Sequence, residues 1–279
     1  VPTSLVLKNQ KITMDKAFLV AFSITLLAGL STVFGSFIVL FSKSKKTSWL
    51  SFSMSFAAGV MLYISFVEII PDSIHVFKIQ NTNFFTSNAY INFALFFLTG
   101  SGLAFLLEKV LPDHKISEKI SSGISTKRRI YRTGVLIAIS LAIHNFPEGI
   151  ITFMECYTNL ISGLALALAI ALHNIPEGMS ISVPILHATG SKKKAILYTA
   201  LSGITEPIGA LFCYMIIKDG IKPFTEAAMM SAVGGIMVFI SIFVLMPLSI
   251  QYKENRQPLF GFISGCTIIG LSIFLMNSL

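Results

Sequence analysis

The sequence is poor in charged residues and in cysteine. Asp, Glu, Lys and Arg make up 12% of its 279 residues, about half the share found in a soluble domain. Its three cysteines, Cys156, Cys213 and Cys266, are far apart and form no C-x-x-C pair. An odd, scattered set argues against a disulfide framework and against a thiolate metal site. We expect these cysteines to be apolar fillers in or near helices.

Apolar residues are abundant and occur in long runs. The chain is 54% hydrophobic, with 24 Phe and a mean hydropathy of +0.77. Eight segments are long enough and apolar enough to cross a bilayer as helices. The first is too long an uncharged run to be a signal peptide. We therefore predict an all-α membrane protein, residues 1–279 forming a single polytopic domain, with spans near Ala17–Phe41, Ser48–Ile70, Ala89–Leu107, Thr133–Phe153, Leu160–Leu186, Ala195–Ile217, Ala227–Ile250 and Pro258–Met276.

The net charge of +8 indicates a topology rather than nucleic-acid binding. Alternate connections, including one near residues 108–132, hold 15 of the 21 basic residues. The positive-inside rule places that side in the cytoplasm. Both termini are then extracytoplasmic, and we expect a multi-pass protein of the cell (inner or plasma) membrane. The 108–132 loop is polar and contains one histidine, His114.

One motif occurs twice. Residues 142–149 read Ala-Ile-His-Asn-Phe-Pro-Glu-Gly, and residues 171–178 read Ala-Leu-His-Asn-Ile-Pro-Glu-Gly. In each copy His and Glu are four apart and share a helix face. Such groups are costly at membrane depth unless they have partners, and they are usually functional there. Polar glue between helices would explain one copy, but the repetition favours a divalent-metal site between the two spans.

A third acid and three prolines extend this pattern. Glu206 precedes Pro207 in the sixth span, while Pro147 and Pro176 lie in the two motifs. Each proline removes a helical hydrogen bond and should kink its helix. Three carboxylates close together in a low dielectric repel one another, and a divalent cation relieves that repulsion. Imidazole with carboxylate suits Zn²⁺, Fe²⁺ and Mn²⁺ better than Ca²⁺ or Mg²⁺.

The second span carries two weaker candidates. Glu68 and Asp72 flank Pro71 near its expected end. They fit either a solvated helix terminus or an entrance for cations. Met61 lies deeper in this span and fits core filling.

The duplicated motif resembles the signature of the ZIP zinc and iron permeases, most closely the bacterial zinc-uptake type, and the resemblance covers essentially the whole chain. It implies a 3+2+3 helical bundle in which spans one to three and six to eight form an inverted repeat around spans four and five. We find no such repeat in the sequence beyond the local one. It also implies a midplane binuclear metal centre between spans four and five, and alternating access. The first site would use His144, Glu148, His173 and Glu177. The second would use Asn145, Asn174 and Glu206, bridged by Glu148 and Glu177. Met61 falls at a thioether position and Glu68 at an entrance position.

The expected function is uptake of Zn²⁺, with Fe²⁺, Mn²⁺, Co²⁺ and Cd²⁺ as further candidates. No catalytic cofactor and no enzyme activity are expected. The partners would be metal ions and the bilayer, with a homodimer left open and no nucleic acid. An intramembrane metalloprotease would need H-E-x-x-H, whereas here Asn follows each His. A cation channel that uses the acids as a filter stays open.

Overall fold

The computed structural model describes residues 3–41, 47–80, 88–110, 123–216, 222–251 and 256–277. The basic stretch 43–46, residues 111–122 of the expected loop, Lys218 and Lys253 lie outside them. The described residues are almost entirely helical and contain no strand. Their elements are α1 (Thr3–Phe41), α2 (Thr47–Ile64), η1 (Ser65–Ile69), α3 (Ile70–Gln80), α4 (Ala89–Val110), α5 (Gly123–Thr158), α6 (Leu160–Thr189), α7 (Lys192–Gly203), α8 (Thr205–Ile216), α9 (Pro223–Phe239), η2 (Ile240–Leu245), α10 (Met246–Gln251) and α11 (Gln257–Asn277).

The prediction of eight spans is confirmed. Within the described ranges, eight helices or runs of helices are long and apolar enough to cross a membrane. The second span comprises α2, η1 and α3, the sixth α7 and α8, and the seventh α9, η2 and α10. Large apolar side chains such as Leu27, Leu98 and Phe274 are more than 60% exposed on the outside of the bundle. This is the surface expected of a protein whose solvent is lipid.

Several predicted boundaries were wrong. The second span does not end near Ile70 but continues through Pro71 to the end of α3, so Glu68 is not at a helix terminus. Residues 123–132, predicted as loop, form the first turns of α5. The sixth span is two helices that meet at Ile204, close before Pro207, whose missing N–H leaves the Gly203 carbonyl without a helical partner. By contrast, α5 continues through Pro147 and α6 through Pro176.

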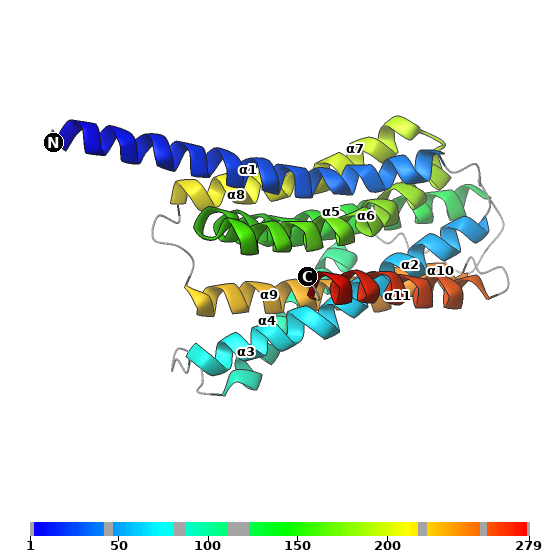
Figure 1. The fold of residues 1–279 in the computed structure, drawn as a ribbon. Helices are drawn as coiled ribbons and strands as arrows, with labels where there is room; N and C mark the ends of the chain where they lie inside the picture. The colour runs from blue at the N-terminus through cyan, green and yellow to red at the C-terminus, as the bar shows by residue number, and fades with distance from the viewer. Residues whose placement is uncertain are drawn as a thin grey trace.

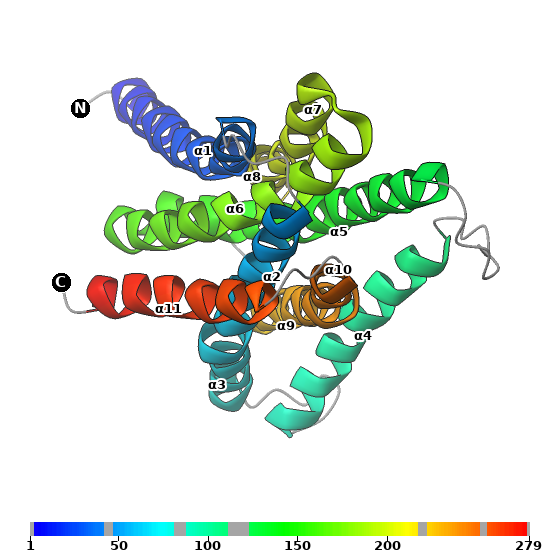
Figure 2. The same ribbon diagram turned by 90° about the vertical axis from the view of Figure 1, so that its right-hand side faces the viewer.

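The helices form two layers. One, which we call the first layer, contains α1, α5, α6, α7 and α8; the second layer contains α2, α3, α4, α9, α10 and α11 (Figure 1). Figure 2 views the bundle from one end and shows α2 of the second layer beside α6 of the first. The motif-bearing helices α5 and α6 lie next to each other in the middle of the bundle (Figure 1).

Glycines create the closest helix crossings, and these crossings stay within a layer. A Cβ on Gly149 would overlap the backbone of Glu206, and one on Gly178 would overlap Thr32. In the second layer a Cβ on Gly100 would overlap Ala232 in the same way. Every described glycine that meets the backbone of another helix this closely meets a helix of its own layer. Each layer is therefore tightly joined internally, as small residues allow in membranes.

The structure also reveals the inverted repeat. Span one packs on α6 as span six packs on α5, and α11 packs on α2 as α4 packs on α9. Both η1 and η2 are π-helical turns, each closed by a bond to a serine carbonyl, from Ile70 N to Ser65 O and from Met246 N to Ser241 O. Such turns add one residue to a helix and break its regular ladder. Spans two and seven run in opposite directions through the bundle (Figure 1).

This repeat does have a sequence signal. Residues 59–73 and 235–249 align without a gap and share Gly, Met, Ile, Ser, Pro and Ser at matching positions. Corresponding residues make corresponding bonds, since Ser101 Oγ donates to Gly235 O at 3.1 Å and Cys266 Sγ donates to Gly59 O at 3.3 Å. The expectation that all cysteines are apolar fillers was therefore incomplete, because it fits Cys156 and Cys213 but not Cys266.

Candidate metal centre

The two motifs meet face to face across the contact between α5 and α6. His144 Nε2 lies 3.4 Å from Glu148 Oε2 on its own helix and 3.1 Å from Glu177 Oε1 on the other. His173 Nε2 lies 3.4 Å from Glu148 Oε1. Two imidazoles and two carboxylates thus form one continuous cluster. The cluster is at most 5% exposed at any of its four residues.

The two asparagines of the motifs bind backbone carbonyls outside the cluster. Asn174 Nδ2 donates to Ala28 O on α1 at 3.0 Å, and Asn145 Nδ2 donates to Ser202 O on α7 at 3.4 Å. Ala28 and Ser202 each precede the glycine, Gly29 or Gly203, at the crossing of α1 and α7. The asparagines therefore anchor α1 and α7 to the motif helices in matching ways, and both amide oxygens stay without a hydrogen-bond partner.

Glu206 joins the motif residues from the start of α8. Its Oε1 accepts a bond from Asn174 Nδ2 at 2.5 Å, and its side chain is fully buried. The backbone of Glu206 lies directly against Gly149, which brings α8 onto α5. Glu206 also interacts electrostatically with Glu148 and Glu177. Three acids are thus gathered in one buried region, as the sequence predicts.

Several polar atoms of these side chains have no hydrogen-bond partner within the protein. The close contacts of His144 Nε2 with Glu148 and Glu177 are not hydrogen bonds, so the buried atoms without a hydrogen-bond partner include both carboxylate oxygens of Glu177, Oε2 of Glu148 and Oε2 of Glu206. Buried carboxylate oxygens are costly in this condition. The contacts are pairwise, however: among the described residues, no three or more His, Cys, Asp and Glu side chains already surround one ion position. Side-chain rotation is needed before several donors can share an ion.

The two weaker candidates lie in the second span. Glu68 is part of η1, is partly buried, and interacts electrostatically with His173 and Asp72. It is thus placed between the more exposed Asp72 and the cluster. Met61 is fully buried in the main apolar core, which also includes Met179 of α6. Its burial fits core filling, and a role as a thioether ligand stays a prediction.

Thr32 is a residue that the sequence reasoning missed. Its backbone meets Gly178 on α6, as the backbone of Glu206 meets Gly149 on α5. It is fully buried, and its Oγ1 has no hydrogen-bond partner. The available signal was the pair of patterns Gly29-x-x-Thr-x-x-Gly35 and Gly203-x-x-Glu-x-x-Gly209. Thr32 is therefore the repeat counterpart of Glu206. An uncharged side chain occupies the position in the first span that is equivalent to this acid in the sixth.

Eight apolar spans around a buried cluster of imidazoles, carboxylates and amides define a polytopic membrane protein with a candidate cation site. A family model described as the ZIP zinc transporter matches residues 111–273. This protein belongs to the ZIP zinc transporter family, as the motif predicts. That is a family of transporters rather than of enzymes.

Full-length relatives agree with this assignment. The chain is 40% identical over 294 residues to a protein named zinc transporter ZupT from Campylobacter jejuni, an alignment that covers 95% of this chain and 99% of the relative. It is 40% identical over 275 residues to the protein of that name from Nitratidesulfovibrio vulgaris, covering 94% and 98%. It is 37% identical over 280 residues to that from Clostridium perfringens, covering 92% and 96%.

Proposed function

We propose that this protein carries Zn²⁺ across the cell membrane through the cluster between α5 and α6. The observation that carries the proposal is the chain of contacts from Glu177 through His144 and Glu148 to His173, buried in the middle of the bundle. Nitrogen and oxygen donors of this kind suit Zn²⁺. Family membership and the names of the relatives support zinc as the cargo. Fe²⁺, Mn²⁺, Co²⁺ and Cd²⁺ are proposed as competing cargo, because the same donors accept them.

The first ion would be held by His144, Glu148, His173 and Glu177. Ligand atoms about 2 Å from a tetrahedral Zn²⁺ lie about 3.3 Å from one another. The contacts between these side chains, 3.1–3.4 Å, match that spacing. Zn²⁺ between them would give the orphaned oxygens of Glu177 a partner. Small side-chain rotations would complete the coordination.

A second ion would make the centre binuclear. The amide oxygens of Asn145 and Asn174 and the free oxygen of Glu206 are its donors, with Glu148 and Glu177 shared between the two ions. Amide oxygens are weak ligands for Zn²⁺, so we assign transport to the first ion. The second ion, which depends on Glu206, would tune selectivity and rate.

Alternating access would arise from movement of the first layer against the second. All donors of both sites belong to α5, α6 and α8, within the first layer. The close glycine crossings join helices inside each layer and never across the boundary between layers, among the described glycines. The boundary is thus formed by side chains, which can slide more readily than interlocked backbones. Shear of packed helices is a known way to alternate between states.

The ligand assignment is tested by replacing both histidines. We expect His144→Ala/His173→Ala to lose most Zn²⁺ binding, because it removes both nitrogen donors, while the protein still assembles. Equilibrium dialysis of purified protein and ⁶⁵Zn uptake into proteoliposomes measure the two effects. His75→Ala, at an exposed position of α3, is the matched control. Unchanged zinc affinity in the double variant would remove the cluster from the mechanism.

The channel alternative is tested in the same vesicles. A carrier with a buried site saturates with Zn²⁺ and shows counterflow, in which unlabelled zinc inside accelerates entry of labelled zinc. A channel gives flux that follows the gradient without counterflow. Repeating the uptake with Fe²⁺, Mn²⁺, Co²⁺ and Cd²⁺ as competitors ranks the cargo.

A further inference from the structure

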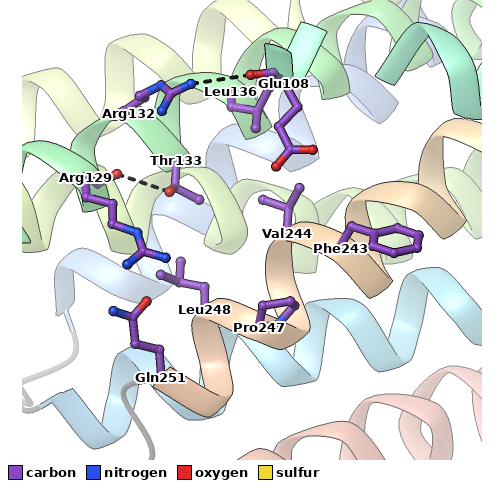
Figure 3. Close-up of a pocket in the computed structure, with 10 residues that line it drawn as sticks. All are labelled: Glu108, Arg129, Arg132, Thr133, Leu136, Phe243, Val244, Pro247, Leu248 and Gln251. Carbon is purple, nitrogen blue, oxygen red and sulfur yellow. Dashed lines mark hydrogen bonds between the residues drawn. The ribbon is translucent and has the colours of Figure 1, made fainter. Parts of the chain in front are cut away.

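A cavity of about 170 Å³ lies away from the metal centre, where the ends of α4 and α10 meet the beginning of the α5 span (Figure 3). None of the proposed metal donors lines it. A water molecule occupies about 30 Å³ in the liquid, so the cavity can hold a considerably larger group. It is situated on the boundary between the two layers, since α5 belongs to the first layer and α4 and α10 to the second.

One end of the cavity is cationic. Arg129 and Arg132 come from successive turns of α5, and Figure 3 shows the Arg129 guanidinium pointing toward the amide of Gln251 on α10. Arg132 Nη2 donates to the carbonyl of Glu108 at 3.4 Å, which holds that side chain at the rim. The carboxylate of Glu108 also lines the cavity. Two guanidinium groups against one carboxylate leave a net positive lining.

The other end of the cavity is apolar and reaches the outside of the bundle. Leu136 of α5 and Val244 of η2 are buried in its wall. Phe243, also in the wall, is 60% exposed on the membrane-facing surface. The lining therefore changes from guanidinium and amide to aliphatic and aromatic along the direction of the spans. An amphipathic lining of this kind fits a ligand with an anionic head and a hydrocarbon tail.

The inverted repeat argues against a cation route at this place. Val244 and Leu248, which line the cavity, align with Glu68 and Asp72 in the other copy of the repeat. At the opposite end of the bundle the same positions are thus acidic, as a path for metal ions requires. Here the acids are replaced by apolar residues and two arginines are added. Arginine is the side chain best suited to bind a phosphate, because its planar guanidinium can donate two parallel hydrogen bonds.

We propose that this cavity binds a phosphate group supplied by the head of an anionic membrane phospholipid. Arg129 and Arg132 would donate to the phosphate, the Gln251 amide would donate from α10, and the acyl chains would run along Phe243. Basic pockets between transmembrane helices bind anionic headgroups in this way. The bound lipid would connect the two layers across the boundary on which the cavity is situated.

Lipid retention on the intact protein tests the site. Purified protein is exchanged into mixed micelles containing phosphatidylglycerol or phosphatidylcholine, and bound lipids are counted by native mass spectrometry. We expect preferential retention of phosphatidylglycerol, and we expect Arg129→Gln/Arg132→Gln to weaken it by about tenfold or more, because two charge-assisted bonds are lost. Lys127→Gln/Arg128→Gln is the matched control, since it removes the same charge from exposed positions beside the cavity. An equal loss in both double variants would mean general attraction and overturn the site.

Two further arms make the result decisive. Val244→Phe fills the cavity while it keeps both arginines, so it should reduce phosphatidylglycerol binding even if the arginine variant folds poorly; full retention in Val244→Phe would overturn the proposal. Inorganic phosphate is added as a competitor. If millimolar phosphate displaces the lipid completely, the site belongs to a free anion and the lipid source is wrong. If the lipid survives that competition, the tail contributes as proposed.

Discussion

At the scale of single residues, the seven candidate ligand residues were predictable because their residue types are costly to bury in a membrane. Two apolar segments each contain a His, an Asn and a Glu, and a third contains Glu206. Such groups are costly at membrane depth and are usually functional there. All seven are buried in one region of the structure. What the pattern could not show is that each asparagine donates to a backbone carbonyl, at Ala28 or Ser202, because any residue type supplies a carbonyl. Thr32 was missed for a related reason. A lone threonine is common in apolar helices, because its hydroxyl can bond a carbonyl of the preceding turn.

The first prediction at this scale concerns Glu206. Glu206→Gln removes one charge but keeps the shape and a hydrogen-bonding group beside Asn174 Nδ2. Because the first ion keeps all four of its proposed ligands, we expect zinc uptake to stay within about tenfold of the unmodified protein, the lower range for loss of a supporting group. The preference among Zn²⁺, Fe²⁺ and Mn²⁺ should shift. Competition uptake in proteoliposomes measures both quantities.

The matched control for Glu206 is Glu226→Gln, an acid in the first turn of α9 that takes no part in the cluster. It should change neither rate nor preference. Complete loss of zinc uptake in a well-assembled Glu206→Gln protein would make the second site essential, and the proposed division of labour between the two sites would then be wrong.

At the scale of helices, sequence patterns located every span but not the irregular turns. The π-helical turns η1 and η2 each precede a proline, Pro71 or Pro247. In each case the helix continues through the proline instead of ending there. Because proline usually ends or kinks a helix, the sequence suggested a terminus near Ile70. The break in span six was signalled by Pro207. Its location depends on the crossing with α1, where Gly29 lies against the Gly203 carbonyl.

The second prediction concerns the crossing between α5 and α8. Gly149→Ala would place a methyl group into the backbone of Glu206, so the helices must separate. We expect a loss of stability of about 1–3 kcal/mol, as for other overpacked contacts, and a strong loss of zinc uptake because Glu206 is displaced. Thermal unfolding in detergent and uptake in proteoliposomes are the measurements.

Gly102→Ala provides the control for that substitution, because a Cβ at Gly102 meets nothing within 4 Å. It should leave uptake unchanged, and the lower backbone entropy of alanine should slightly raise stability. Equal behaviour of Gly149→Ala and Gly102→Ala would show that the crossing tolerates separation, contrary to the structure.

At the scale of the whole molecule, two arrangements follow from the inverted repeat. Spans related by the repeat make equivalent contacts, which produces the two layers and places α5 and α6 between spans one and six on one side and the second layer on the other (Figure 1). The local motif repeat was easy to find because its residues are rare in apolar segments. The longer repeat, 59–73 with 235–249, escaped notice because most of its matches exchange one apolar residue for another. Only contacts such as those of Ser101 and Cys266 make the correspondence evident.

The last prediction concerns orientation in the membrane. The start of α7, with Lys192 to Lys194, lies at the end of the bundle that also holds the start of α5, whereas the start of α9 lies at the other end (Figure 1). The excess of basic residues at the first of these ends indicates that this end faces the cytoplasm.

Two exposed lysines, Lys193 and Lys222, offer a matched pair of labelling positions. Each is replaced by cysteine in a protein whose three native cysteines are changed to serine or alanine. We expect a membrane-impermeant maleimide to label Lys222→Cys in intact cells, because that position would face outward. Lys193→Cys should react only after the membrane is permeabilised, and the same variants in permeabilised cells show that both thiols are accessible. The reverse pattern would invert the predicted topology and would place Glu68 and Asp72 toward the cytoplasm.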